Sequence, residues 1–229
     1  MKYEVYKAEE RGRSDHGWLK SRFSFSFADW YNPERMGFRS LRVLNDDTIA
    51  PSSGFGRHPH RDMEIITIVT QGAVTHEDSM GNQGEVHSGE VQVMSAGTGV
   101  VHGERNASST DTLELFQLWI TTRDQGIAPR YDQRHFASDA TLLVSPDGRE
   151  GSLSIMQDAY ITRRTIFAGE NVSYELHKSG NGVYVFVVSG KIILDSVSLE
   201  SRDALGIEDT DSFTVSAEQE STVLFIEVP

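Results

Sequence analysis

The sequence contains no cysteine at any of its 229 positions. This absence excludes disulfides, thiolate metal ligands and a cysteine nucleophile. It also fits a reducing compartment. The first residues, MKYEVYKAEERGR, are charged and lack the apolar core of a signal peptide. We therefore expect a cytoplasmic protein.

Positive charge is also scarce, with 21 Lys and Arg residues against 34 Asp and Glu residues and a formal net charge of -13. Binding to nucleic acid or to an anionic membrane surface requires a basic face, which this balance disfavours. Long apolar runs are missing as well. Stretches such as VYVFVV at 183–188 are far shorter than the roughly 20 residues that span a bilayer. We expect neither a nucleic-acid partner nor a membrane partner.

Helical periodicity over ten or more residues is absent, and short β-rich runs are present instead. They are rich in β-branched, aromatic and leucine residues and are separated by Gly, Asn, Asp and Ser, a spacing typical of sandwiches and barrels. Examples are 40–44, 65–70, 91–94, 113–121, 183–188 and 223–228. The pattern predicts an all-β fold.

A weak internal repeat suggests that this β-fold is duplicated. EIITIVTQG (64–72) resembles VYVFVVSG (183–190), and SGEVQVMSAG (88–97) has a position comparable to that of EDTDSFTVSAE (208–218). Two barrels that each bury their own core leave this kind of trace. The segment 124–136 carries Gly, Pro and charges, and we expect it to connect the two lobes.

Two short motifs carry the chemistry. GFGRHPHRDME (54–64) places His58 and His60 two residues apart, and SAGTGVVHGERN (95–106) does the same with His102 and Glu104. Side chains at i and i+2 of a strand share a face, so both pairs can project into one barrel. Three imidazoles and a carboxylate suit Fe(II), Mn, Ni, Cu or Zn and leave coordination positions open, as catalytic or sensing sites require.

At these residues the chain resembles the bacterial pirin family. The resemblance is dense over residues 12–136 and weaker but collinear afterwards. The segments that carry it are DHGWLKSRFSFSFADWYNPERMGFRSLRVLNDDTIAP (15–51), HPHRDMEIITIVTQG (58–72), HEDSMGNQG (76–84), VQVMSAGTGVVHGE (91–104) and LELFQLWI (113–120). It implies two tandem cupin barrels, of the double-stranded β-helix or jelly-roll type, with a metal-binding lobe at 1–133 and a lobe without metal ligands at 134–229.

The resemblance also implies one divalent metal ion bound by His58, His60, His102 and Glu104, with Fe(II) as the first candidate and Mn, Ni, Cu or Zn as alternatives. The implied activity is a quercetin 2,3-dioxygenase-like opening of a small aromatic, flavonol-like substrate, with Glu104 as the catalytic general base. Two alternatives stay open. One is a metal-dependent, redox-sensing regulator that binds a protein partner, and the other is a zinc-dependent isomerase.

Two positions depart from the family pattern, and one carboxylate competes with Glu104. Arg57 is a large cation that we expect near the pocket mouth, and Gly103 gives HGE where the family usually has HSE. Cupins in general take their carboxylate ligand from the first motif, here Glu64. Glu64 lies an even number of residues after His58 and His60, so on one strand it would share their face. The pirin resemblance favours Glu104 and leaves Glu64 as a partner that orients a histidine.

The remaining histidines are interpreted more simply. His76 and His87 flank a polar turn, and we expect both to face solvent. His177 occupies the place where the second lobe would carry its own HxH, but Ser179 stands two residues on and no HxE follows. We therefore expect no second metal site.

The segment at 15–31 combines a histidine with many aromatic side chains. Phe23, Phe25 and Phe27 alternate as one face of a strand, which favours core packing over a ligand platform. His16, in DHGW, is expected to be structural.

Overall fold

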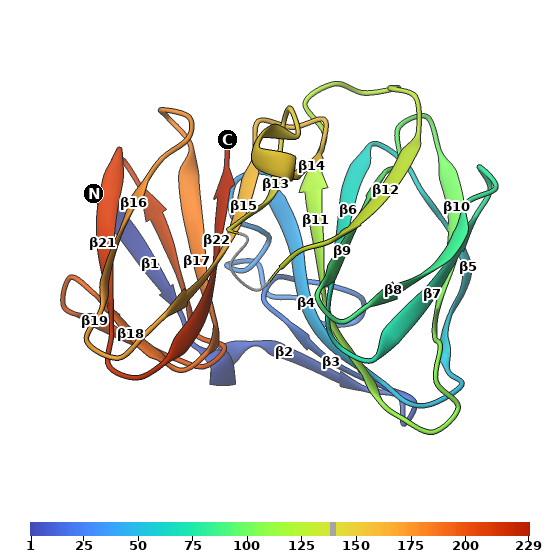
Figure 1. The fold of residues 1–229 in the computed structure, drawn as a ribbon, viewed down its shortest axis with the longest axis horizontal. Helices are drawn as coiled ribbons and strands as arrows, with labels where there is room; N and C mark the ends of the chain where they lie inside the picture. The colour runs from blue at the N-terminus through green and yellow to red at the C-terminus, as the bar shows by residue number, and fades with distance from the viewer. Residues whose placement is uncertain (138–140) are drawn as a thin grey trace. The chain divides into compact units, whose positions relative to one another are not determined.

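The computed structural model describes residues 1–137 and 141–229, and within them nearly all regular structure is β-strand (Figure 1). The predicted all-β class is confirmed. The chain forms two compact units, one made of residues 12–138 and 153–157 and the other of residues 1–11, 139–152 and 158–229. No helix in the described part of the chain has the length and apolar character needed to cross a membrane.

The first unit is built from two antiparallel sheets. One sheet has the order β12-β9-β6-β11-β4-β3-β2 and the other has the order β5-β10-β7-β8, so that β5 is an edge strand (Figure 1). The strands are β2 (Gly12–Asp15), β3 (Leu19–Phe23), β4 (Leu41–Ile49), β5 (Gly54–His60), β6 (Met63–Gln71), β7 (Ala73–Asp78), β8 (Gln83–His87), β9 (Glu90–Ser95), β10 (Val100–Asn106), β11 (Leu113–Thr121) and β12 (Arg130–His135); the short β14 (Leu153–Ser154) also belongs to this unit.

Aliphatic side chains from both sheets fill the space between the sheets. Successive side chains of a strand point to opposite faces, so every second residue of β6 enters this interior. The buried clusters comprise Leu19, Ile49, Val69, Val74, Val86, Leu113 and Leu115, and Ile65, Met94 and Val100. Burial of this apolar surface is the main term that stabilises the barrel.

The second unit repeats the architecture. Its larger sheet contains β1-β20-β17-β22-β15-β13 in that order, and its smaller sheet has the order β16-β21-β18-β19. The strands are β1 (Lys2–Tyr6), β13 (Leu142–Ser145), β15 (Tyr160–Ile166), β16 (Asn171–Glu175), β17 (Gly182–Ser189), β18 (Lys191–Leu194), β19 (Val197–Glu200), β20 (Ala204–Glu208), β21 (Ser212–Ala217) and β22 (Ser221–Val228). Because β1 pairs with β20, residues 1–11 lie in this unit, in contrast to the expected range 1–133.

The topology confirms part of the predicted repeat and corrects the rest. β6 lies between β9 and β11, as β17 lies between β20 and β22, so EIITIVTQG and VYVFVVSG are equivalent strands. β9 therefore corresponds to β20. The segment 208–218 contains β21, which lies between β16 and β18 as β10 lies between β5 and β7. The predicted equivalence of 88–97 with 208–218 is wrong, because β21 corresponds to β10.

The expected lobe connection at 124–136 is wrong for its second half. Residues Arg130 to His135 form β12, which pairs with β9 in register from Arg130 opposite Ser95 to His135 opposite Glu90. β12 is an edge strand, and an edge strand tolerates charges because one of its sides needs no partner. Composition alone could not distinguish this edge strand from a linker.

Candidate metal centre

Three histidines converge from two neighbouring strands. His58 and His60 lie on β5 and His102 lies on β10, with His102 opposite His58 and Val100 opposite His60. The ring centroids are 4.5 Å apart for His58 and His102, 4.8 Å for His58 and His60, and 4.9 Å for His60 and His102. One ring nitrogen from each histidine lies within 4.8 Å of the others. The two motifs therefore meet at one point.

Glu104 lies two residues beyond His102 on β10, and its side chain is buried. Oε1 accepts hydrogen bonds from Thr67 Oγ1 at 3.3 Å and Gln92 Nε2 at 3.1 Å, and Oε2 accepts one from Gln117 Nε2 at 2.8 Å. A carboxylate has about four acceptor positions, so the three neutral donors fix the group and leave room for a further partner.

A β-bulge in β5 lies opposite the interval between His102 and Glu104. His102 pairs with His58, but Glu104 pairs with Phe55, so β5 contains one residue more than β10 in this interval. A bulge locally bends a strand and redirects its side chains, as is common beside active sites. Nδ1 of His58 then donates to the carbonyl oxygen of Gly56 at 2.8 Å, which leaves its Nε2 with a free lone pair.

Burial keeps the imidazoles of His60 and His102 neutral and able to bind a cation. Burial, followed by the neighbouring histidines, lowers the pKa of His60 to about 4 and that of His102 to about 3. Nε2 of His60 is buried without a hydrogen-bond partner among the described residues. The Nε2 atoms of His58 and His102 lie 3.1 Å apart. Two nitrogens each about 2.1 Å from one cation, at roughly a right angle, lie about 3 Å apart. The donor set therefore fits a divalent metal ion.

An apolar cavity of about 330 Å³ opens beside the cluster. Its apolar walls are largely aromatic and comprise Trp18, Leu19, Phe23, Phe27, Phe55 and Trp119. The polar residues that line it are Ser14, His16, Ser21, Asn45, Asp47, His58, Glu104 and Gln117. The Trp119 ring lies 4.9 Å from His60 and 5.3 Å from Phe27. Binding sites for small molecules have this size and this mixture of apolar walls with a few polar groups.

The expected role of the three alternating phenylalanines is correct for Phe25 and incomplete for the others. β3 ends at Phe23, so the alternation does not continue along one strand. Phe25 is buried in the core, whereas Phe23 and Phe27 contact each other at 5.3 Å and line the cavity. His16 lies at the same cavity and its Nε2 is hydrogen-bonded to Ser14 Oγ at 2.8 Å.

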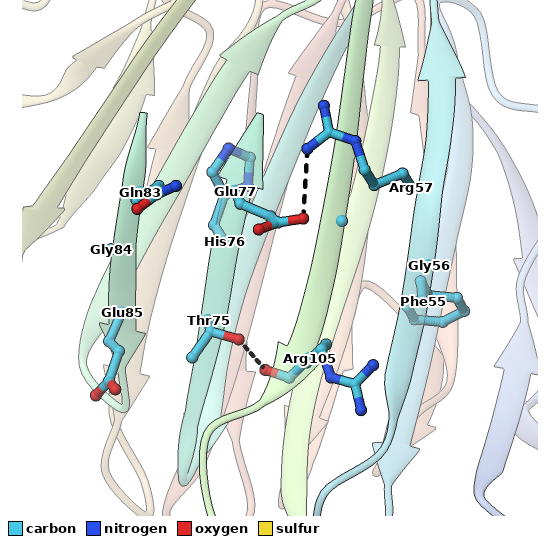
Figure 2. A pocket seen from close by; sticks show the side chains of 11 residues that line it. Phe55, Gly56, Arg57, Thr75, His76, Glu77, Gln83, Gly84, Glu85 and Arg105 are labelled. Atoms are coloured by element: carbon cyan, nitrogen blue, oxygen red, sulfur yellow. Dashed lines mark hydrogen bonds and ion pairs between the residues drawn. The ribbon is translucent and has the colours of Figure 1, made fainter. Parts of the chain in front are cut away.

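Arg57 is not at the mouth of this cavity. It follows the alternation of β5, and its side chain therefore points to the outer face of the sheet, away from His58. There it forms an ion pair with Glu77 at 3.3 Å, in a groove that Thr75 and Arg105 also line (Figure 2). Gly103 lies on the same outer face. Neither departure from the family pattern touches the cavity.

Glu64 is buried, but away from the histidines. β5 ends at His60 and β6 begins at Met63, with Asp62 between them at a φ of +47°. Because this turn separates two strands, the even spacing between Glu64 and the histidines no longer places them on one face. Thr67 of β6 points inward to Glu104, so Glu64, an odd number of residues away, points outward, where Ser95 Oγ donates to its Oε2 at 2.6 Å. The expected contact with a ligand histidine is wrong.

We expect Glu64→Gln to become more stable relative to the native sequence as pH rises. Burial raises the pKa of Glu64 above its usual value of 4.5, against the opposing hydrogen bonds from Ser95 and the Met156 backbone. The folded state then binds this proton more tightly than the unfolded chain does, so the native protein loses stability from about pH 4.5 upward to the raised pKa. Glutamine cannot ionise. Urea unfolding of both metal-free proteins at about pH 4 and pH 8 measures the difference, and a pH-independent difference contradicts this reasoning.

His76 is buried, so its expected exposure is wrong, whereas His87 is exposed as predicted. Nε2 of His76 lies 3.1 Å from Asp78 Oδ2, and the side chains of both residues are fully buried. The His76 ring stacks on Tyr131 at 4.5 Å. His76, His102 and Glu104 each offer a ligand atom within 4.8 Å of the others. The missed signal is the spacing of His76 and Asp78, which puts both on one face of β7.

In the second unit, aromatic side chains occupy the equivalent interior. Tyr174 of β16 and Phe213 of β21 lie opposite each other and stack at 5.3 Å within the core. His177 follows β16, and its Nδ1 contacts the buried Glu227 carboxylate at 3.1 Å. Within residues 1–137 and 141–229, both candidate metal-binding clusters lie in the first unit.

Two family models match the chain, one described as pirin over residues 5–120 and one described as the quercetinase C-terminal cupin domain over residues 142–228. The chain belongs to the pirin family. A quercetin 2,3-dioxygenase of Escherichia coli strain K12 is 45% identical over 225 residues, which cover 97% of each chain. A pirin-like protein of Caulobacter vibrioides is 40% identical and covers 96% of each chain.

Solved pirin structures show the same fold. The bacterial pirin YhhW of Escherichia coli in complex with nickel(II) superimposes with a TM-score of 0.95 at 44% identity, covering 100% of this chain and 99% of that one. The predicted pair of cupin barrels is therefore confirmed. The relative's nickel(II) and the His and Glu cluster of this pirin-family chain agree on a site for one divalent metal ion.

Proposed function

We propose that the chain is a metal-dependent dioxygenase that opens the ring of flavonols such as quercetin. The observation that carries this proposal is the cluster of His58, His60 and His102, with the buried Glu104 two residues beyond His102, beside an aromatic cavity that His58 and Glu104 line. Relatives named quercetin 2,3-dioxygenase, at 45% identity over nearly the whole chain, support the substrate class. Fe(II) is our first candidate for the cation, and nickel(II), present in a relative, is the second.

Polar groups that line the cavity include those that the first step requires. The divalent cation, when bound, supplies Lewis acidity that favours the deprotonated hydroxyl of the flavonol. Glu104 takes that hydroxyl proton as general base. Gln92 donates to one carboxylate oxygen of Glu104 and Gln117 to the other, so the proton acceptor keeps one position throughout the reaction.

The aromatic walls of the cavity position the rings of the substrate. Trp18 and Phe55 pack edge to face at 5.4 Å, and Phe27 and Trp119 do the same at 5.3 Å. Flat aromatic walls of this kind stack on a flat aromatic ligand and exclude water from it. The electron-rich ring that results from deprotonation then reacts with dioxygen and opens with loss of carbon monoxide.

The test couples metal content to turnover. Protein purified without chelator should contain one equivalent of a divalent metal ion and should consume dioxygen and release carbon monoxide when quercetin is added. His87→Ala, which removes an exposed histidine, should leave both properties unchanged. Bound metal without oxygen uptake or carbon monoxide would contradict the proposal and would favour a regulatory protein instead.

A further inference from the structure

A line of buried polar groups runs from the metal cluster to the turn after β7, and two of its atoms have no partner. These atoms are Nδ1 of His102 and Nδ1 of His76, which are both buried and without a hydrogen bond within the described residues. The two rings are tilted by 52° with their centroids 5.4 Å apart. A buried polar atom without a partner is costly, so this pair requires an explanation.

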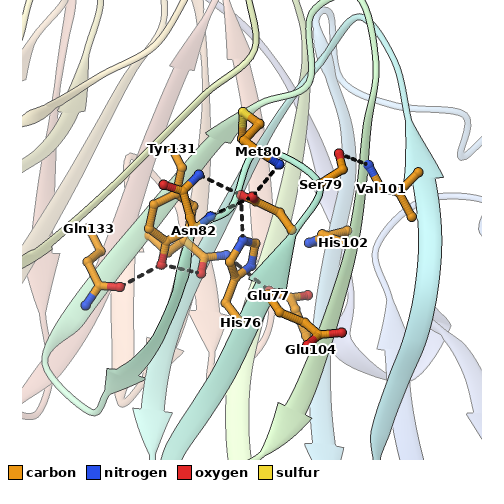
Figure 3. A network of polar contacts seen from close by, with 12 residues as sticks. His76, Glu77, Ser79, Met80, Asn82, Val101, His102, Glu104, Tyr131 and Gln133 are labelled. Atoms are coloured by element: carbon orange, nitrogen blue, oxygen red, sulfur yellow. Dashed lines mark hydrogen bonds and ion pairs between the residues drawn. The ribbon is translucent and has the colours of Figure 1, made fainter.

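Asp78 determines which nitrogen of His76 carries the proton. Oδ1 of Asp78 accepts from the backbone N–H groups of Met80 and Asn82, and Oδ2 accepts from Asn82 Nδ2 at 2.9 Å (Figure 3). The carboxylate thus acts as an acceptor in all of these contacts. Its remaining contact, with His76 Nε2 at 3.1 Å, is then an N–H of His76 that donates. A neutral His76 with a proton on Nε2 has a lone pair on Nδ1.

His102 has the complementary arrangement when it binds a cation. Its Nε2 faces His58 in the cluster and supplies the ligand lone pair. A neutral imidazole that coordinates through Nε2 carries its proton on Nδ1. His102 therefore presents a buried donor, and the nearby His76 presents a buried acceptor.

We propose that His76 is a positioning residue of the metal centre: when the cluster holds its cation, His76 Nδ1 accepts a hydrogen bond from His102 Nδ1, while Asp78 fixes the tautomer of His76. This inference rests on the proposed metal site. Ligand histidines commonly donate their second N–H to an acceptor that sets ring orientation and basicity. Here that acceptor is a second histidine with a carboxylate behind it. Tyr131, stacked on His76 at an angle of 27°, holds the plane of the ring.

The residues around His76 also connect to Glu104, through Tyr131. The hydroxyl of Tyr131 contacts Oε1 of Gln92 at 3.1 Å, and Nε2 of Gln92 donates to Glu104 Oε1 at 3.1 Å. Tyr131 thus links the support of His102 to the support of Glu104. One polar network, which ends at the 79–82 turn, therefore supports both predicted ligands on β10, His102 and Glu104.

Tautomers can be measured directly on the zinc-loaded protein with ¹⁵N-labelled histidine. Long-range ¹H–¹⁵N correlations should show His102 protonated at Nδ1 and His76 protonated at Nε2. A His76 that carries its proton on Nδ1 would overturn the proposal, because two donors would then face each other.

Metal affinity provides the second test, with two variants of similar size. His76→Leu removes the acceptor, and nickel(II) affinity measured by competition with a chelator should fall by about 10- to 100-fold. His76→Asn places an amide oxygen near the position of Nδ1 and should recover most of that loss. A purely structural role would give both variants the same affinity.

Two further results would also overturn the proposal. One is a His76→Leu protein that binds nickel(II) as tightly as the native chain. The other is two equivalents of nickel(II) per native chain with one lost in His76→Leu, which would make His76 a ligand of a second ion. Neither measurement uses quercetin, so absence of dioxygenase activity would leave this inference standing.

Discussion

His60→Ala should abolish high-affinity metal binding and leave the protein folded. The substitution removes a neutral, partly buried nitrogen whose lowered pKa keeps it available to a cation at physiological pH. Loss of one of three imidazoles should weaken binding by far more than the 10- to 100-fold effect of an indirect contact. The fold should persist because the barrel core is aliphatic and separate from the ligands. Elemental analysis after gel filtration measures the first effect, and circular dichroism with thermal melting measures the second.

The matched control is His87→Ala, which removes an exposed histidine from the same unit. It should retain one equivalent of metal. The prediction also covers removal of metal by a chelator, after which the native chain should stay β-rich and melt cooperatively. A chain that unfolds on chelation would behave like a zinc finger, whose folding depends on its metal, and would contradict the prediction.

Glu104→Gln should lower flavonol turnover by at least about 100-fold, the usual scale for loss of a general base. The substitution keeps size and polarity but removes the charge and the proton acceptor. It also places an amide where Thr67, Gln92 and Gln117 all donate, so the amide nitrogen would face a donor. Metal affinity should fall too, because an amide is a poorer ligand than a carboxylate.

Glu64→Gln is the control, because it makes the same chemical change in a buried glutamate of the same barrel. Its side chain points away from the metal cluster and is bonded to Ser95. Turnover and metal affinity should therefore stay near those of the native chain when both variants are measured under one set of conditions. Near-normal turnover in Glu104→Gln beside an inactive, metal-free Glu64→Gln would reverse the two roles.

Much of the candidate site follows from sequence because strand geometry is simple. A separation of two residues on a strand puts His58 beside His60 and His102 beside Glu104, and the structure brings the three histidines to one point, with Glu104 near His102. The same rule fails for Glu64 because alternation of faces holds only within one strand, and a new strand, β6, begins after the turn at Asp62. The rule also places Arg57 on the outer face, and its expected place at the pocket mouth came from sequence proximity to His58.

Other features depend on contacts that no local pattern reveals. His76 is buried because Tyr131, on a strand far along the chain, stacks on it. β1 belongs to the second unit because it pairs with β20, about 200 residues away. Pairings of this range are set by the packing of whole sheets, whereas composition and periodicity describe only a few neighbouring residues.

The position of β5 at the edge of its sheet would give a bound metal ion a structural role as well. Among the strands that the structure describes, β5 has one hydrogen-bonded neighbour, β10, and a bulge interrupts that ladder beside the histidines. Edge strands with few partners are the parts of a sheet that open first. An ion bound by His58, His60 and His102 together would cross-link the edge strand β5 to its neighbour β10. Loss of the ion would then loosen one wall of the aromatic cavity as well as remove its reactive centre.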